Sequence, residues 1–282
     1  MEFARSWLYV SAAHPERFDK ALSSEADAVV LDLEDSVAES HKAFARDAVV
    51  DFVSQHPDRR VVLRVNSPDS GFLTDDLLAI RSLPLGAIRV PKVRYRSDID
   101  LVHASLRGQV ANVELQPIIE TAQGVVNLGE ILQHGQVRRV CLGEGGLSTE
   151  LRVPDRAVLS SIWMQAVVLS AAERRWSPIQ GVYPNLDDEE GLQASTLKGK
   201  AMGLYGRSVI HPKQVAVVND IFTPTPAEID KAREVTSSLE AARSAGSGGV
   251  RLADGRFVDA PALLAAERTL RVAAAITSQH RS

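Results

Sequence analysis

Short runs of aliphatic and β-branched residues alternate with longer helix-like segments along most of this chain, and this alternation restricts its possible folds more than any other feature. Such alternation is typical of parallel βα units. The runs at 28–31 and 61–63 are apolar on both faces, as strands covered by helices must be. Eight strands are predicted, at residues 7–10, 28–33, 61–65, 87–90, 114–119, 137–142, 178–182 and 207–210.

The number of predicted βα units favours one α/β fold over its alternatives. Eight units within about 220 residues fit a (β/α)8 TIM barrel, and a doubly wound open sheet is the second choice. A length of 282 residues is compatible with two domains, but a single barrel also accounts for it. We therefore expect a TIM-barrel catalytic domain at residues 1–222.

In the remaining residues, 223–282, the alternation of strand-like and helix-like segments stops, and they are predicted to form a C-terminal helical extension. An isolated helix of the length expected at its end is marginal in water, so that helix must dock on another surface. We interpret the segment as a lid or an oligomerisation element. Its predicted parts are a charged helix at 226–245, a glycine-rich break at 246–249, a hairpin at 250–258 and an apolar helix at 261–276.

Composition and charge exclude several classes of protein. Lys and Arg number 32 against 36 Asp and Glu, and the net charge of −4 argues against nucleic-acid or anionic-membrane partners, which need a basic surface. The single cysteine, Cys141, excludes an intramolecular disulfide and a multi-cysteine metal site. The first residues lack the apolar core of a signal peptide, and no apolar run approaches the length of a membrane span. The chain is expected to be a soluble, globular protein of the cytoplasm.

Polar residues and glycines follow most of the predicted strands, at the positions where a parallel barrel forms its active site. Carboxylates suit a hard cation, arginine and lysine suit an anionic substrate, and glycines let the backbone approach a ligand. On this basis Lys92, Gly143 and Gly145 are candidates for substrate binding. The full set is Asp32, Glu34, Asp35, Arg64, Asn66, Lys92, Glu120, the segment Gly143-Glu144-Gly145-Gly146, and His211.

Each of these residues also has a purely structural interpretation. Asp32 and Asp35 could end a strand and cap a helix. Arg64 could make an ion pair at the barrel rim, and Glu120 could take part in helix capping. His211 is better explained as a brace of the last βα turn than as a base.

Short motifs distributed over most of the chain carry a family resemblance. They are Arg5-Ser6 with Leu8, Pro15-Glu16-Arg17-Phe18, Asp32-Leu33-Glu34-Asp35-Ser36-Val37, Arg64-Val65-Asn66, Val90-Pro91-Lys92, Pro117-Ile118-Ile119-Glu120-Thr121, Ile210-His211-Pro212-Lys213-Gln214-Val215 and Asp254-Gly255-Arg256-Phe257-Val258-Asp259-Ala260-Pro261. No single motif is specific. In this order and spacing, the chain resembles the citrate lyase beta subunit-like branch of the HpcH/HpaI aldolase family.

The resemblance implies a carbon–carbon lyase or aldolase that acts on a 3-hydroxyacyl-CoA thioester such as citryl-, malyl- or citramalyl-CoA. It implies a magnesium ion, replaceable by manganese, that chelates a 2-keto acid, with coenzyme A as part of the other substrate. Glu120 matches a metal ligand, and Arg64 matches the arginine that binds the keto-acid carboxylate. Asp32 and Glu34 match the acidic cluster around the metal-bound waters. The resemblance also implies a homotrimer or homohexamer, in which Asp259 of a neighbouring subunit completes the site as an acid or base.

The sequence departs from the family pattern at three positions. The family's magnesium-binding aspartate aligns with Gly146, which offers no carboxylate. Glu144, two positions earlier, is our candidate for its replacement, on the same face if strand geometry persists. Gln180 stands where aspartate is common, and Arg207 stands where lysine is common.

These departures leave three interpretations open. The protein could hold magnesium through Glu120, Glu144 and water, since octahedral magnesium keeps much of its hydration shell. It could act on a substrate without coenzyme A, or it could be a non-catalytic homologue that binds an acyl-CoA or a partner protein. A phosphate-handling barrel is disfavoured, because no glycine-rich loop follows the last predicted strands.

Overall fold

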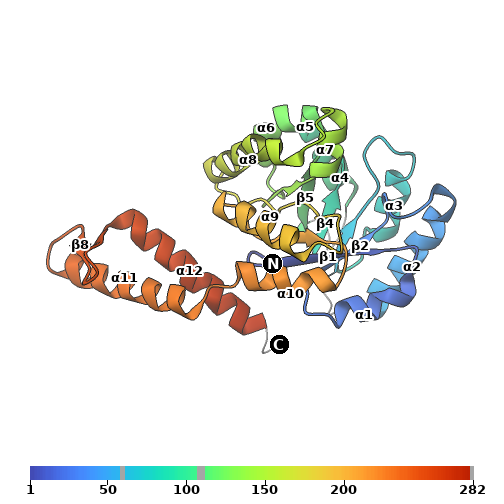
Figure 1. Cartoon of the computed structure of the whole chain (residues 1–282). Helices are drawn as coiled ribbons and strands as arrows, with labels where there is room; N and C mark the ends of the chain where they lie inside the picture. The colour runs from blue at the N-terminus through green and yellow to red at the C-terminus, as the bar shows by residue number, and fades with distance from the viewer. Residues whose placement is uncertain (58–60, 107–111, 280–282) are drawn as a thin grey trace. The chain divides into compact units, whose positions relative to one another are not determined.

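A parallel sheet forms the centre of the first of the two units, Met1–Asn219 and Asp220–Ser282, into which the chain divides (Figure 1). This computed structural model describes residues 1–57, 61–106 and 112–279. Within those ranges the sheet has seven strands in the order β6-β5-β4-β3-β2-β1-β7, and all neighbours are parallel. The strands are β1 (Ser6–Ser11), β2 (Ala28–Asp32), β3 (Val62–Arg64), β4 (Ala87–Val90), β5 (Glu114–Ile119), β6 (Cys141–Leu142) and β7 (Arg207–Val209).

Backbone hydrogen bonds at Ile179 and Gln180 join the two edge strands of this sheet. The amide of Leu142 in β6 donates to the carbonyl of Ile179 at 2.9 Å, and the amide of Ser208 in β7 donates to the carbonyl of Gln180 at 2.9 Å. Both contacts belong to parallel bridges, so the sheet closes into a barrel and the TIM-barrel prediction is confirmed. The strand predicted at 178–182 is reduced to two paired residues, because Pro178 has no amide hydrogen to donate.

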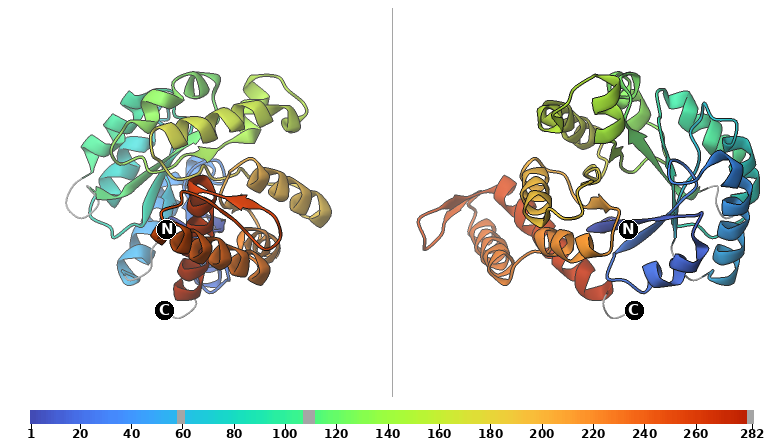
Figure 2. Two further views of the ribbon diagram at one scale, coloured as in Figure 1. Left: turned by 90° about the vertical axis from the view of Figure 1, so that its left-hand side faces the viewer. Right: turned by 45° about the vertical axis from the view of Figure 1, so that its right-hand side comes forward.

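Helices cover the outer side of the barrel (Figures 1 and 2). They are α1 (Phe18–Leu22), α2 (Lys42–Gln55), α3 (Leu73–Ile80), α4 (Arg96–Ser105), α5 (Ala122–Val126), α6 (Leu128–Leu132), α7 (Glu144–Glu150), α8 (Ser160–Ala172), α9 (Glu189–Ala201) and α10 (Lys213–Phe222), with short 3-10 turns at Pro15–Arg17, Glu39–His41 and Arg156–Leu159. Helix α2 buries Ala45, Val49 and Val53, which recur every four residues and form its barrel-facing stripe. Among the described residues, no helix is both long enough and apolar enough to cross a membrane.

Side chains that alternate along the strands fill the interior of the barrel. Its apolar part is a buried cluster that includes Trp7. Four polar residues lie in register across neighbouring strands, because Asp32 pairs with Arg64, Arg64 with Arg89, and Arg89 with Gln116. Residues in register share a face of the sheet, so all four side chains belong to the same interior.

The second unit consists of two packed helices with a short hairpin between them. The helix α11 (Pro226–Ser244) begins with a capping box, in which Thr225 and Glu228 each accept a hydrogen bond from the backbone amide of the other. Apolar side chains such as Val235 and Leu239 form its buried cluster. The elements are α11 (Pro226–Ser244), β8 (Val250–Arg251), antiparallel β9 (Phe257–Val258) and α12 (Ala260–Gln279). The predicted helices and hairpin are present, and their role as a lid or oligomerisation element stays a prediction.

Gly206, at the entry to β7, is predicted to tolerate no side chain. Its φ is +79°, and a Cβ atom there would lie 2.5 Å from the carbonyl oxygen of Ala4. Gly206→Ala should therefore lower the free energy of unfolding by about 1–3 kcal/mol in chemical denaturation. Gly129→Ala in α6 is the control, because nothing lies within 4 Å of its added methyl group and the change should be neutral or slightly stabilising. Equal stability of Gly206→Ala and the wild type would contradict the close contact.

Candidate active site

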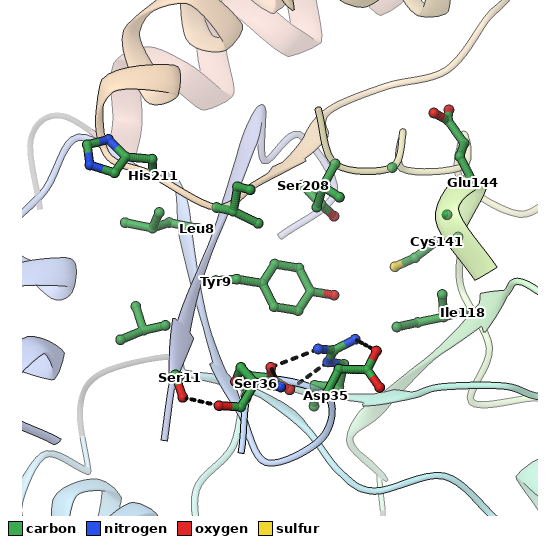
Figure 3. A pocket seen from close by; sticks show the side chains of 18 of the residues that line it. Leu8, Tyr9, Ser11, Asp35, Ser36, Ile118, Cys141, Glu144, Ser208 and His211 are labelled. Carbon is green, nitrogen blue, oxygen red and sulfur yellow. Dashed lines mark hydrogen bonds and ion pairs between the residues drawn. The ribbon is translucent and has the colours of Figure 1, made fainter. Parts of the chain in front are cut away.

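Most of the predicted site residues line one cavity of about 970 Å³ in the first unit. Figure 3 shows this cavity, with Asp35 and Ser36 on one side and Cys141 and Glu144 on the other. Its walls also include Asp32, Arg64, Glu120, Gly143, Gly145 and Gly146. The residues that follow separate strands therefore meet at one place, as a parallel barrel requires.

Arg64 is the centre of an ion-pair cluster at this cavity. Its Nε lies 2.6 Å from Oδ1 of Asp32 and its Nη2 lies 2.7 Å from Oδ2, which makes a bidentate pair. Its Nη1 lies 2.8 Å from Oε2 of Glu34 and 3.6 Å from Oδ2 of Asp35. Nζ of Lys92 lies 2.7 Å from Oε1 of Glu34 and 3.3 Å from Oδ1 of Asp35. The hydrogen bonds of the guanidinium go to Asp32, and its contacts with Glu34 and Asp35 are ion pairs, so N–H groups of Nη1 and Nη2 remain for a ligand.

Burial and charge act in opposite directions on the acids of this cluster. Burial raises the pKa of Asp32, but the Arg64 guanidinium outweighs burial, so this pKa lies below its ordinary value. For Glu34, burial outweighs the attraction of Arg64 and Lys92, so its pKa lies above its ordinary value. Asp32 is therefore the permanent counter-charge of Arg64, and Glu34 is the acid that holds its proton more tightly.

Glu120 is held by an uncommon backbone conformation at Lys92. Lys92 follows β4 with a φ of +52°, in the left-handed region that residues with side chains rarely adopt. Its amide donates a hydrogen bond of 2.9 Å to Oε1 of Glu120, and among the described residues nothing donates to Oε2. Burial, and then the negative charge of Glu34, raise the pKa of Glu120 to about 7. At neutral pH this carboxyl group therefore lacks a full counter-charge.

Gly143 and Gly146 lie directly against Glu120. A Cβ atom on Gly143 would lie 2.3 Å from the Cβ of Glu120, and one on Gly146 would lie 3.0 Å from its Oε2. The amide of Gly143 donates to the carbonyl of Ile119, and the carbonyl of Gly145 accepts from the hydroxyl groups of Ser148 and Thr149 in the same helix, α7. The glycines at 143 and 146 thus make room for the Glu120 carboxylate. The predicted contact of Gly143 and Gly145 with substrate stays a prediction.

Glu144 begins helix α7 and does not continue the strand before it. The expectation that strand geometry puts Glu144 and Gly146 on one face is therefore wrong, because residues two apart do not face each other on a helix. In Figure 3 the Glu144 carboxylate is directed away from Asp35, on the other side of the cavity. It packs beside Gly181, where a Cβ atom would lie 3.4 Å from its Cγ. Its role as a metal ligand stays a prediction.

The donor set fits a magnesium ion shared with substrate better than one enclosed by protein. The described ranges contain no group of three or more His, Cys, Asp or Glu that could hold a metal by themselves. Glu120 nevertheless lines the cavity, and its raised pKa indicates a carboxylate without a full counter-charge. Magnesium is usually bound through one or two carboxylates and keeps several waters. Glu120 therefore fits as the protein ligand, with water and substrate oxygens as the remaining ones.

Two other predicted residues have different surroundings. His211 lines the cavity, and its Nδ1 accepts a hydrogen bond from the amide of Lys213 at 3.1 Å, as expected for a brace of the turn. Asp259 belongs to the second unit, where it is exposed immediately before α12. Its predicted role in a neighbouring subunit's site stays a prediction.

Sequence reasoning assigned no site role to three residues that shape the cavity, although Lys42 belongs to the motif around Asp32 that carries the family resemblance. Tyr9 and Ser208 line it from β1 and β7 (Figure 3). Nζ of the buried Lys42 donates to the carbonyls of Leu33 at 2.6 Å and Glu34 at 2.7 Å, which fixes the loop that carries the carboxylates. Side chains alternate between the two faces of a strand, and this alternation could have indicated that Tyr9 points into the barrel. Ser208 and Lys42 could be found only once strand register and helix position were known.

The raised pKa of Glu120 predicts how the stability of the metal-free protein depends on pH. The pKa is about 7 in the folded protein and about 4.5 in the unfolded chain, so the folded state binds more protons between these values and its stability falls as pH rises through this window. In buffer with a chelator, Glu120→Gln should raise the free energy of unfolding above pH 7, by up to about 3 kcal/mol, and the gain should vanish near pH 4.5. The exposed Glu39→Gln is the control. A difference between Glu120→Gln and wild type that does not change with pH would contradict the shift.

Comparisons with known proteins bear on this geometry. The model of a family described as HpcH/HpaI aldolase/citrate lyase matches residues 5–212. A (3S)-malyl-CoA thioesterase of Cereibacter sphaeroides is 33% identical over 279 residues, which cover 97% of this chain and 96% of that protein. An L-malyl-CoA/beta-methylmalyl-CoA lyase of Rhodobacter capsulatus is 29% identical over an alignment of 301 positions, which covers 95% of this chain and 94% of that protein.

Solved structures give the same result. The crystal structure of CitE from Mycobacterium tuberculosis, in complex with magnesium, acetoacetate and coenzyme A, has a TM-score of 0.81 and 29% identity over 97% of this chain and 100% of that one. The citrate lyase beta subunit of M. tuberculosis complexed with oxaloacetate and magnesium has a TM-score of 0.69 and 29% identity over 79% of this chain and 98% of that one. With the family model matching most of its length, this chain belongs to the HpcH/HpaI aldolase/citrate lyase family.

Proposed function

We propose that this protein is a carbon–carbon lyase that cleaves or forms a 3-hydroxyacyl-CoA thioester, using a 2-keto acid chelated by magnesium. Citryl-, malyl- and citramalyl-CoA are the substrate class. Support comes from the charges at the cavity and from relatives that are lyases or thioesterases of CoA esters. The solved relatives that contain magnesium, keto acids and coenzyme A support the same assignment.

The charge balance of the cavity mouth is the observation that carries the proposal. In the described part of the chain, three carboxylates, those of Asp32, Glu34 and Asp35, form ion pairs with two cations, Arg64 and Lys92, so the carboxylates exceed the cations paired with them. The nearby Lys42 ammonium donates to backbone carbonyls and forms no ion pair there. Ionised Glu120 adds to this excess, because it forms no ion pair in those ranges either. A 2-keto acid is itself an anion, so it binds here only when that excess is neutralised. Metal and keto acid are therefore expected to bind together.

Each residue at the mouth has a definite part in the proposed reaction. In cleavage the hydroxyl proton leaves, the bond between C2 and C3 breaks, its electron pair passes to the thioester carbonyl as an enolate, and a proton returns to C2. Magnesium, when bound, polarises the keto oxygen and stabilises negative charge on it. Arg64 holds the keto-acid carboxylate through the N–H groups that it does not donate to Asp32. Asp32 holds Arg64, and return of the proton to C2 is the role that the family resemblance implies for Asp259.

Basic residues at the edge of the cavity fit the other half of the substrate. Arg17 ends the 3-10 turn before α1 and Lys20 lies in α1; both side chains are exposed, and both residues line the cavity. Coenzyme A carries several phosphate groups, which arginine and lysine bind in water-accessible positions. This arrangement supports a CoA ester over a substrate without coenzyme A.

Thioester hydrolysis is the second candidate, and the thioesterase relative favours it. Water would then attack the thioester carbonyl and release free coenzyme A and a hydroxy acid. Glu120 suits a general base for that water, because a base is most effective when its pKa lies near the working pH, and the pKa of Glu120 is about 7.

The products distinguish the two candidates. The protein should be incubated with malyl-, citramalyl- or citryl-CoA and Mg²⁺, and the keto acid and the free thiol should be measured in the same samples. Lyase activity yields a keto acid without free thiol, and hydrolysis yields free thiol without keto acid. A chelator should abolish lyase turnover, and Mg²⁺ or Mn²⁺ should restore it. Absence of both products from all three substrates would reject the proposed enzyme in favour of a binding homologue.

Arg64→Lys should lower kcat/KM by about 100-fold, because lysine cannot make the bidentate contacts of the guanidinium. The control is Arg46→Lys, which changes a largely buried arginine that is ion-paired with Asp76 away from the cavity. Arg46→Lys should retain activity within a few-fold of the wild type. Equal losses in the two variants would indicate a general effect on folding and contradict a specific role for Arg64.

Glu144→Ala tests whether this residue compensates for Gly146 as a metal ligand. If it does, Mg²⁺ or Mn²⁺ affinity measured by calorimetry should fall about tenfold further in this variant. Glu150→Ala in the same helix is the control, because Glu150 does not line the cavity. Unchanged metal affinity in Glu144→Ala would leave Glu120 as the only carboxylate ligand supplied at this end of the barrel.

A further inference from the structure

A buried arginine without a carboxylate partner lies beneath the cavity. The side chain of Arg89 on β4 is completely buried, and its contacts in the described part of the chain include no acid. Its Nε donates to Oε1 of Gln116 at 2.9 Å. Its Nη1 donates to the hydroxyl oxygens of Tyr9 at 3.0 Å and Ser208 at 3.1 Å. Its Nη2 has no hydrogen-bond partner among those residues.

The polar network around Arg89 carries one positive charge in excess. The amide nitrogen of Gln116 donates to Oε1 of Glu114 at 3.1 Å, and Nε of Arg139 lies 3.2 Å from the same oxygen. Two guanidinium groups therefore share one carboxylate, and Arg139 is the one that contacts it. Arginine stays protonated in proteins, so Arg89 keeps its charge. Two aromatic rings, with centroids 4.7 and 5.3 Å from its guanidinium carbon, offset only part of the cost of burying that charge.

In the part of the chain that the structure describes, no residue accepts the hydroxyl proton of Tyr9 or of Ser208. Both oxygens accept a hydrogen bond from Arg89, and in the described ranges neither hydroxyl donates to another residue. A hydroxyl group has one proton to donate, and both residues line the cavity, where Figure 3 shows the Tyr9 hydroxyl facing Ile118 and Cys141. Burial raises the pKa of Tyr9 in spite of Arg89 and Arg64, so its phenol keeps this proton at neutral pH. The two hydroxyls are thus donors for a bound molecule.

The cavity is consequently polarised along its length. Its mouth carries the excess of carboxylates around Arg64, and the part lined by Tyr9 and Ser208 has two donors backed by the Arg89 cation. A ligand that matches both ends has a metal-chelating keto-carboxylate at one end and a second anionic oxygen group at the other. A keto acid that ends in a methyl group would leave both donors and the buried cation unmatched, which is costly.

This inference rests on the function proposed above. We propose that Tyr9 and Ser208 bind the distal carboxylate of a dicarboxylic 2-keto acid such as oxaloacetate, and so select it over pyruvate or glyoxylate. Tyr9 and Ser208 donate the hydrogen bonds to that carboxylate. Arg89 is a positioning residue, because it orients both hydroxyls and supplies the positive charge behind them.

Oxaloacetate and pyruvate are the probes that test this selection, because they differ only in the distal carboxylate. Their dissociation constants should be measured by calorimetry with saturating Mg²⁺ and freshly dissolved oxaloacetate. Wild-type protein should bind oxaloacetate about tenfold more tightly than pyruvate. Tyr9→Phe and Ser208→Ala should each weaken oxaloacetate binding several-fold and leave pyruvate binding within twofold. Arg89→Met, which replaces an unpaired buried charge with an apolar chain of similar length, should abolish the preference.

Matched controls separate this effect from a change in folding. Tyr205→Phe and Ser170→Ala alter a tyrosine and a buried serine that do not line the cavity, so the preference should persist in both. Thermal unfolding of every variant identifies any variant that fails to fold. If Arg89→Met fails to fold, the conservative variants Tyr9→Phe and Ser208→Ala still decide the test.

The possible outcomes distinguish this inference from the proposed function. Binding of both keto acids with equal affinity in the wild type would overturn the selection and leave the lyase proposal standing. Equal weakening of both keto acids in the three variants would overturn it too, because the donors would then serve a group that both ligands share, such as an enolate oxygen. If neither keto acid binds to the wild type with Mg²⁺, the lyase proposal itself fails, and the selection fails with it.

Discussion

The backbone hydrogen bonds of Ile179 and Gln180 hold the two edges of the sheet together, and the site exists only because they do. An open parallel sheet has two separate faces, and its inward side chains do not converge on an axis. Closure gives the strands one shared interior, in which Tyr9 on the first strand and Ser208 on the last can both contact Arg89. Closure needs few residues, because the neighbouring strands already have the curvature and the two bridges only complete the ladder.

Charges that are unmatched in the free protein distinguish this interior from an ordinary core. The charges of Arg64 and Asp32 balance each other in a bidentate ion pair, which fixes the position of the guanidinium among the other groups. Around it, the carboxyl groups of Glu34 and Glu120 have raised pKa values because burial is not fully offset by cations. Unmatched buried groups reduce the stability of the free protein, and a ligand that matches them adds stability in proportion to its binding. The same groups therefore lower the stability of the ligand-free protein and raise that of the ligand-bound protein.

The sequence predicts the architecture well because apolar runs and helix-like segments follow directly from local pattern. It also brings Asp32, Arg64 and Glu120 to one cavity, because the ends of parallel strands must meet at one edge of the barrel. Glu34 and Lys92 join them through ion pairs and do not line the cavity, and the roles of all five stay predictions. The strand at 178–182 is overestimated, since pairing depends on a donor that Pro178 lacks. Glu144 is assigned to the wrong kind of element, because a strand-to-helix transition is not visible in a run of glycines.

Arg89 shows the limit of reading a strand without its register. The direction of the charged side chain in the run Ala87-Ile88-Arg89-Val90 cannot be predicted from the sequence, because the alternation of side chains along a strand does not say which face lines the interior of the barrel. Only the pairing of Arg89 with Arg64 and Gln116 places it inside the barrel. Its hydroxyl partners come from strands distant in sequence, so no local motif could reveal them.

The close packing of Gly146 against Glu120 limits what can be substituted at position 146. A side chain at 146 would begin 3.0 Å from Oε2 and 3.2 Å from the carbonyl oxygen of Glu120, so an aspartate there requires Glu120 to move. Glu120 cannot move freely, because Gly143 touches its Cβ position and the left-handed Lys92 holds its other oxygen. Gly146 and Glu120 therefore form one packing unit, in which a side chain at 146 is accommodated only by a shift of Glu120 of a few tenths of an ångström. A substitution introduced at 146 to add a metal ligand would thus displace the carboxylate that it is meant to assist.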